Sequence, residues 1–385
     1  MSWLMHHTRS EEYASQAEEF LKQQEISRAN ELYCLAAEAE VIALENLDCS
    51  KTRTIGITAV SAVSLFYKSH IFTRAKQIAH KWLSTDFLPE FAIEELEQIL
   101  QDIRYKETLA KSGIQFIDGE VLVSVSGGEI LYGAAPLDLV LDRVEKIRNI
   151  FYRTTEFLLD MELRKRGKPN SSVKSQCDPW LLQAAPGSYQ FAVRVRKPQD
   201  QLSIPGLPDA ALRVEQITKK FLEIIRATTQ DPEGALTEVV PQEEYRETFL
   251  KLTRELAPPS TGNSFSKMEI KSTNDIESRP VILSTDTREV IKHALKKTES
   301  LPQELPDHKI IELRGTLRGL QLDNDWIEVS VNGKSEMIYD AKEEIDDVIG
   351  PMVNRRVVIE VVERFDKPVD KRYYLRDIQL EENLQ

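Results

Sequence analysis

Apolar side chains recur at helical spacing along the first part of the chain. They return every three or four residues from Ser10 to Leu47, and again from Ala59 to Leu83. Pro89 then precedes a third amphipathic stretch, Glu90 to Tyr105, as a proline at the start of a helix does. The pattern predicts an α-helical unit over residues 1–110.

Two stretches of this unit are alike. FLKQQEISRANELYCLAA (20–37) and FYKSHIFTRAKQIAHKWL (66–83) each place an alanine after a short polar turn. Residues 11–105 therefore resemble the tetratricopeptide repeat, a family of helix–turn–helix units. The chain departs from that family in spacing: Ala29 and Ala75 lie 46 residues apart, whereas the family repeats every 34 or so residues. The tryptophan of the family's first helix is also absent.

The resemblance implies a helical scaffold with a groove that binds a protein partner. In the family, the alanine lets two helices approach closely and the aromatic residue before the turn fills the groove. Phe66, Phe72 and Ala75 are therefore candidate binding residues. The alternative is a helical hairpin that only packs against the rest of the same chain.

The middle of the chain begins with strand-like alternation. FIDGEVLVSVSGGEILYG alternates apolar and polar residues and turns at Gly127-Gly128. Pro136 then suits the start of a long helix, expected from Leu137 to Arg166. The helix is expected to end in Arg164, Lys165 and Arg166, with Lys168 just beyond. These four residues are the densest basic cluster of the chain and a candidate binding site for a phosphate-rich partner. The alternative is that they complement the dipole at the end of the helix.

The remaining middle segment mixes strands and helices, which predicts an α+β domain over residues 111–300. The expected strands are Tyr189–Arg196, Phe265–Lys271 and Val281–Leu283, and the expected helices are Ala210–Thr228, Gln242–Leu256 and Thr285–Lys297.

The last part of the chain reads as short strands, which predicts a small β-barrel over residues 305–385. Five strands are expected, with a short helix after the third, and Asn332-Gly333 predicts a type I′ hairpin turn. This order resembles the OB-fold over residues 308–382, and an SH3-like barrel is the alternative. OB-folds often bind single-stranded nucleic acid through aromatic and basic residues, which makes Trp326 a candidate. The alternative role of Trp326 is to fill the barrel.

Composition narrows the class of protein. The formal net charge of −13 argues against tight nonspecific binding of nucleic acid over the whole surface. Three cysteines without CxxC spacing indicate a reduced compartment, and no apolar run reaches transmembrane length. We expect a cytoplasmic protein that does not enter a membrane.

Catalytic motifs are sparse. The six histidines form no metal-ligand spacing, and the sequence contains no GxSxG, GxGxxG or P-loop motif. MEIK (268–271) is similar to the E-x-K of metal-dependent PD-(D/E)xK nucleases. That resemblance implies a divalent ion at Glu269 and a water or phosphate at Lys271. An amphipathic edge strand gives the same pattern without chemistry.

Together these patterns predict a multidomain α+β protein with no cofactor and no resident metal. The function expected first is a non-enzymatic, protein-binding adaptor or sensor component of a bacterial intracellular system. The alternative is a nucleic-acid-binding or nuclease-related protein, with Glu269 and Lys271 in its central domain.

Overall fold

The computed structural model describes residues 3–117, 119–131, 133–183, 189–197, 216–259, 264–273, 279–298, 309–367 and 370–381. The chain forms two compact units, Met1–Ile114 and Gln115–Gln385. The segments expected as central domain and barrel both belong to the second unit. No helix in the described ranges is both long and apolar enough to cross a membrane.

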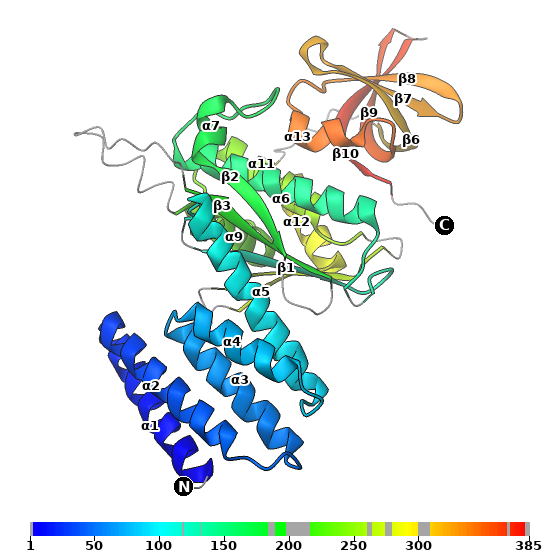
Figure 1. Ribbon diagram of the computed structural model, residues 1–385. Coiled ribbons are helices and arrows are strands. Elements are labelled where there is room, and N and C mark those ends of the chain that lie inside the picture. Colours follow the sequence, from blue (N-terminus) through cyan, green and yellow to red (C-terminus); the bar gives the residue numbers. More distant parts are fainter. Residues whose placement is uncertain are drawn as a thin grey trace, which may run out of the picture. The chain divides into compact units, whose positions relative to one another are not determined.

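The first unit is entirely helical where it is described, as the periodicity predicts (Figure 1). Each helix packs against the next, and α3 contacts α2, α4 and α5. Its core mixes small and large side chains, with Ala29, Ala36, Ala62 and Ala75 completely buried. The helices are α1 (Trp3–Lys22), α2 (Ile26–Glu45), α3 (Thr52–Lys68), α4 (Phe72–Leu83) and α5 (Glu90–Ser112).

The two similar stretches form the same turn. Gln24 and His70 adopt left-handed backbone angles, with φ of 62° and 61°. In each hairpin the following amide closes the turn onto the phenylalanine four residues before that position: Glu25 N–H to Phe20 O at 2.9 Å, and Ile71 N–H to Phe66 O at 3.0 Å. The sequence likeness therefore corresponds to one repeated local structure.

The second unit contains an antiparallel sheet with strand order β2-β3-β1-β4-β5. One face is apolar: Val121, Val123 and Val125 of β1 are buried, and the residues between them are partly exposed. The strands are β1 (Val121–Ser126), β2 (Asp178–Gln183), β3 (Gln190–Arg196), β4 (Lys267–Ser272) and β5 (Val281–Leu283).

Helices pack on the apolar face of this sheet and share its core. Phe151 of α6 stacks on Phe221 of α9, with ring centroids 4.3 Å apart. The main helices are α6 (Leu137–Leu158), α9 (Ile217–Gln230), α11 (Glu243–Leu256) and α12 (Thr285–Thr298); α7 (Ser171–Gln176) and α10 (Ala235–Val239) are short. The first part of the helix expected at 210–228 lies outside the described residues.

One local expectation for this unit was wrong, and one strand was missed. Helix α6 ends at Leu158 rather than Arg166, because Asp160 takes a left-handed φ of 52° and Met161 N–H bonds back to Glu156 O at 3.0 Å. The basic cluster thus lies beyond the helix and cannot serve its dipole. Strand β2 was not expected, since it contains Pro179; the sheet tolerates this proline because β2 is an edge strand.

The last part of the chain forms a closed five-stranded barrel, as predicted, with strand order β10-β8-β7-β6-β9. Strands β8 and β10 pair in parallel, and the other neighbours are antiparallel. Asn332 and Gly333 have φ of 50° and 81°, as the predicted type I′ turn requires. The elements are β6 (Lys309–Gln321), η1 (Leu322–Asn324), β7 (Trp326–Val331), β8 (Lys334–Tyr339), α13 (Asp346–Ile349), η2 (Gly350–Met352), β9 (Arg356–Lys367) and β10 (Asp370–Leu380).

Candidate binding surfaces

The basic arm, residues Arg164–Lys168, contacts the acidic loop of the barrel, Lys342–Asp347. Arg164 lies 3.0 Å from Asp347, and Lys165 lies 2.5 Å from Glu343. Arg166 donates to two carbonyl oxygens of the loop, and Gly167 N–H donates to Asp346 at 2.6 Å. The densest basic cluster of the chain therefore binds an acidic segment of the same chain. Lys168 is exposed.

A buried arginine strengthens this contact. Arg153 of α6 has no exposed surface and pairs with Glu156 at 3.0 Å and Asp347 at 2.6 Å. Burial lowers the pKa of Arg164, but its bond to Glu156 and the charge of Asp347 outweigh burial, so the pKa is raised. The bond from Lys165 lowers the pKa of Glu343. The basic arm therefore remains charged and is already paired, which leaves little of it for a phosphate ligand.

The candidate residues of the helical unit differ in accessibility. Phe66 is 1% exposed and Ala75 is completely buried, so both build the core of the hairpin. Phe72 is partly exposed and lies beside Tyr67 and His70, with ring centroids 5.9 and 5.8 Å away.

One strip of α3 remains accessible although α2, α4 and α5 all pack against this helix. The strip follows helical spacing and consists of Ile57, Ser61, Ser64 and Lys68. Ile57 is 48% exposed. The two serines between Ile57 and Lys68 are small and partly exposed. We call it the α3 strip.

Glu269 and Lys271 lie on β4 and face away from the apolar side of the sheet. Across the sheet, Glu269 is opposite Ser124 and Ile282, and its carboxylate pairs with Lys267. In the described part of the chain, no group of three His, Cys, Asp or Glu residues is arranged to hold a metal ion. The neighbouring strand positions thus supply no second carboxylate for a nuclease site.

Trp326 belongs to a row of aromatic residues on the outer face of the barrel. It lies opposite Tyr339 of β8, which in turn lies opposite Tyr374 of β10. The three side chains are partly exposed. The guanidinium of Arg364 lies 4.5 Å from the ring centre of Tyr374, and that of Arg372 lies 5.7 Å from the ring centre of Tyr339. We call Trp326, Tyr339 and Tyr374 the aromatic row. Sequence analysis found Trp326 but missed Tyr339.

The acidic residues of the barrel are unevenly placed. Residues 309–381 contain 12 basic and 16 acidic side chains. Six of these carboxylates pair with cations of the sheet and helix layers. The other ten carboxylates of the barrel are therefore outnumbered by its 12 basic side chains. The six are Asp323, Glu343, Glu344, Asp347, Glu360 and Asp377. The net negative charge of the barrel therefore lies at its contact with the rest of the second unit.

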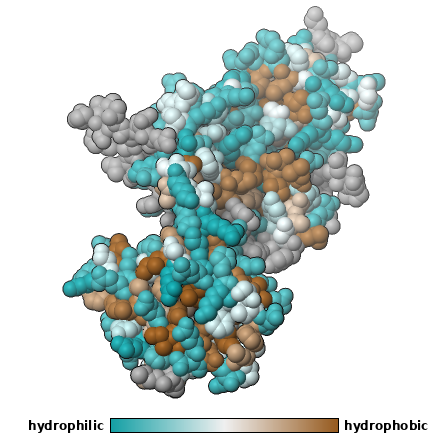
Figure 2. All heavy atoms as spheres, viewed as in Figure 1, coloured by the Kyte–Doolittle hydropathy of each residue, from teal (hydrophilic) through white to brown (hydrophobic). Residues whose placement is uncertain are grey.

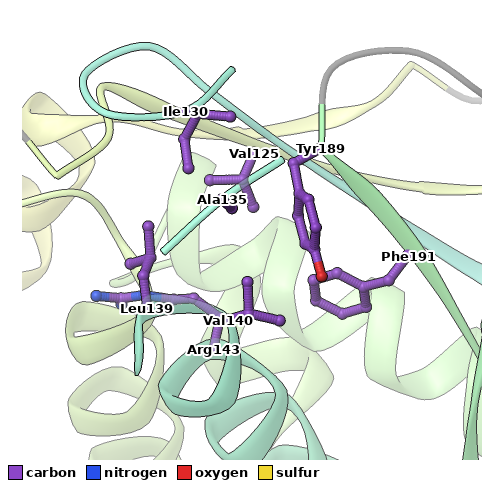
Figure 3. Close-up of a pocket in the computed structure, with 8 residues that line it drawn as sticks. All are labelled: Val125, Ile130, Ala135, Leu139, Val140, Arg143, Tyr189 and Phe191. Atoms are coloured by element: carbon purple, nitrogen blue, oxygen red, sulfur yellow. The ribbon is translucent and has the colours of Figure 1, made fainter. Parts of the chain in front are cut away.

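A small apolar hollow lies between β1, β3 and the start of α6 (Figure 3). It is too narrow to admit a water molecule and is therefore not a site for a small-molecule ligand. It is lined by Val125, Ile130, Ala135, Leu139, Val140, Arg143, Tyr189 and Phe191.

Neither family models, curated proteins nor solved structures give a match to this chain.

Proposed function

We propose that this chain is a non-enzymatic adaptor whose helical unit binds a segment of a protein partner along the α3 strip. The observation that carries the proposal is the accessibility of this strip on a helix that three others surround. Ser61 and Ser64 are partly exposed and lie between the exposed Ile57 and Lys68, so the strip joins an apolar end to a basic end through small polar side chains.

The chemistry of the strip suits an extended or helical segment. Ile57 offers apolar contact at one end, and the Ser64 hydroxyl offers a hydrogen bond in the middle. At the other end Lys68, whose Nζ lies 5.3 Å from the ring centre of Tyr33, offers a positive charge. The buried carboxylate of Glu40, 3.0 Å from His7 and hydrogen-bonded to Ser61, lies alongside. Such a mixture of apolar and polar groups is typical of peptide recognition.

The test is an affinity purification of the tagged full chain from its native cells, with nuclease added to remove nucleic acid. Ser64→Arg places a long side chain on the strip, and Ser64→Ala is the matched control. The proposal expects a stoichiometric protein partner with wild type and Ser64→Ala, and its loss with Ser64→Arg. Equal recovery by all three proteins would place the partner elsewhere.

A second candidate function is the binding of single-stranded nucleic acid by the barrel, favoured by the aromatic row. The strand order, the parallel β8–β10 pair and the α13 segment between β8 and β9 fit an OB-fold. Aromatic side chains on neighbouring strands offer stacking surfaces to successive bases, and arginines beside them attract phosphates.

The charge distribution supports this second candidate. Since six carboxylates are paired at the contact with the rest of the unit, the acidic composition of the barrel does not oppose an anionic ligand on its outer face. Fluorescence anisotropy with a labelled oligothymidylate tests it. Tyr374→Ala should weaken binding by about tenfold, because stacking contributes roughly 1–3 kcal/mol per base.

The control for this test is Arg314→Ala, which removes a 60% exposed cation from the β6 strand, outside the aromatic row. Nucleic-acid binding through the row predicts a small change for Arg314→Ala and a large one for Tyr374→Ala. Equal losses would indicate attraction by general charge. No binding at low salt would exclude the candidate.

A further inference from the structure

The two most exposed large apolar residues of the described chain, Leu137 and Leu131, lie at and just before the start of α6. They are 70% and 69% exposed, and Leu141 of the same helix is 58% exposed. Leu137 and Leu141 are one helical turn apart on the same side of α6, and Leu131 adjoins Ile130, which lines the hollow. Figure 2 shows hydrophobic residues gathered over this part of the molecule. We call Leu131, Leu137 and Leu141 the leucine patch.

The helix also presents apolar side chains to the hollow. Leu139 and Val140 line the hollow (Figure 3). Leu137 and Leu141 are exposed instead. The first turn and a half of α6 is therefore apolar on most of its circumference, unlike an ordinary surface helix. Exposed leucines that occur singly need no explanation, but a cluster beside a hollow indicates an interaction surface.

Charges of both signs lie around the patch. On the side of Leu141, Arg355 is 51% exposed and lies 3.4 Å from Asp142; on the side of Leu137 the charges are carboxylates. Glu129 and Asp138 are exposed directly beside Ile130 and Leu137. Farther along α6, Glu145 is also exposed and pairs with Arg148 at 2.7 Å. The positive charge of Arg143 points inward, where it donates to Glu255 O at 2.5 Å and Leu256 O at 3.0 Å. An incoming segment would thus meet apolar surface in the middle and carboxylates at the edge.

We propose that the leucine patch and the adjoining hollow bind a basic amphipathic helix of a partner protein. Its apolar side chains would cover Leu137 and Leu141, with one side chain above the hollow, and its lysines or arginines would lie near Glu129 and Asp138. The hollow is too narrow to admit a side chain or a free small molecule, so the partner would cover it from outside. The site is on the second unit and is independent of the α3 strip.

The probe is a fluorescent Leu/Lys model peptide with helical spacing, titrated with the full chain and followed by anisotropy. Two peptides control for its parts: a Leu/Glu peptide of the same pattern, and a Ser/Lys peptide with the same charge and no apolar face. Of the three peptides, only the Leu/Lys peptide is expected to bind. Equal binding of the Ser/Lys peptide would reduce the effect to the net charge of −13 and overturn the proposal.

The matched variants are Leu137→Ser with Leu141→Ser, and Ile310→Ser as an exposed apolar control on the barrel, where Ile310 is 53% exposed. The double variant should weaken binding by at least about tenfold, since two leucines are no longer covered. Ile310→Ser should leave binding unchanged. Equal affinity of the double variant and wild type would overturn the site.

Sedimentation analysis of the same variants distinguishes a second copy as the occupant. If wild type is a dimer that Leu137→Ser with Leu141→Ser converts to a monomer, the patch is a self-association surface and the proposal is wrong. If wild type and the double variant have the same mass, and only the double variant loses peptide binding, the proposal is supported.

Discussion

Arg254 of α11 donates two hydrogen bonds to the carboxylate of Asp377 on β10, at 2.9 and 3.0 Å. A third, from Nη2 to Ile378 O at 3.0 Å, fixes the arginine along the barrel strand. Arg254 is 1% exposed. The pair therefore joins the helical layer to the barrel through a charge that has almost no contact with water.

Replacing Asp377 should destabilise the second unit strongly. Asp377→Ala leaves Arg254 buried with Glu255, at 3.5 Å, which also pairs with Arg288, and with the more distant charge of Glu344. Removing one member of a buried pair costs about 3–5 kcal/mol of unfolding free energy. Urea denaturation of the full chain measures it. Asp323→Ala is the control: this carboxylate is 85% exposed and pairs with Arg166 at 3.5 Å, so it should change stability by less than about 1 kcal/mol.

Lys146 should give the chain an unusual dependence on pH. Burial and the charge of Arg143 lower its pKa from 10.5 to about 8. Between these values the unfolded lysine keeps its proton and the folded one loses it, so the contribution of Lys146 to stability rises with pH. Below about pH 8, the cost of holding the buried charge opposes folding.

A comparison with Lys146→Met isolates this effect. The unfolding free energy of wild type, relative to the variant, should increase by up to about 3 kcal/mol as the pH rises from about 8 to about 10.5. Urea denaturation over this range checks it. A difference that stays flat or falls would mean that the ion pair of Lys146 with Asp142, at 2.9 Å, holds the proton instead.

Gly315 of β6 should not tolerate a side chain. A Cβ there would lie 2.4 Å from Ser330 O and 2.9 Å from Val329 Cγ1 on the neighbouring strand. Gly315→Ala should lower the thermal stability of the barrel by about 1–3 kcal/mol, because the strand cannot yield without losing its pairing. Gly350→Ala is the control, since nothing lies within 4 Å of its Cβ position. Similar melting temperatures for both variants would contradict the expected crowding.

Replacing Gln24 by glycine should increase the stability of the helical unit. Its left-handed φ of 62° strains any residue with a Cβ, and glycine relieves that strain. Thermal unfolding should show a gain of about 0.5–1 kcal/mol for Gln24→Gly. In the middle of α1, Gln16→Gly should cost about 0.5–1 kcal/mol. The two substitutions should therefore change the free energy of unfolding in opposite directions, and a loss of stability in both would contradict the expected strain at Gln24.

Local patterns in the sequence were sufficient for much of the fold. Helical spacing gave the helices of the first unit, and Asn332-Gly333 gave the turn between β7 and β8, because both depend on neighbours in the chain. The predicted end of α6 was wrong because the helix ends at the left-handed backbone angle of Asp160, which the sequence pattern does not indicate. The Arg164–Arg166 cluster is typical of a helix end but lies beyond it.

The candidate sites were harder to predict because their partners are distant in sequence. The basic arm contacts Glu343 and Asp347, nearly two hundred residues farther along, and spacing alone cannot pair them. The acidic run Lys342–Asp347 was a usable indication, as it complements the arm in charge. The aromatic row also depends on strand register, which places Tyr339 between Trp326 and Tyr374.

The placement of the six paired carboxylates has a practical consequence for dissection of the chain. A barrel produced by itself would lose the cations that pair with these carboxylates, and the face that carries them would repel polyanions. Its association rate with any anionic ligand would fall, most of all at low ionic strength. Fragments would thus understate what the barrel can bind when its neighbour supplies the counter-charges.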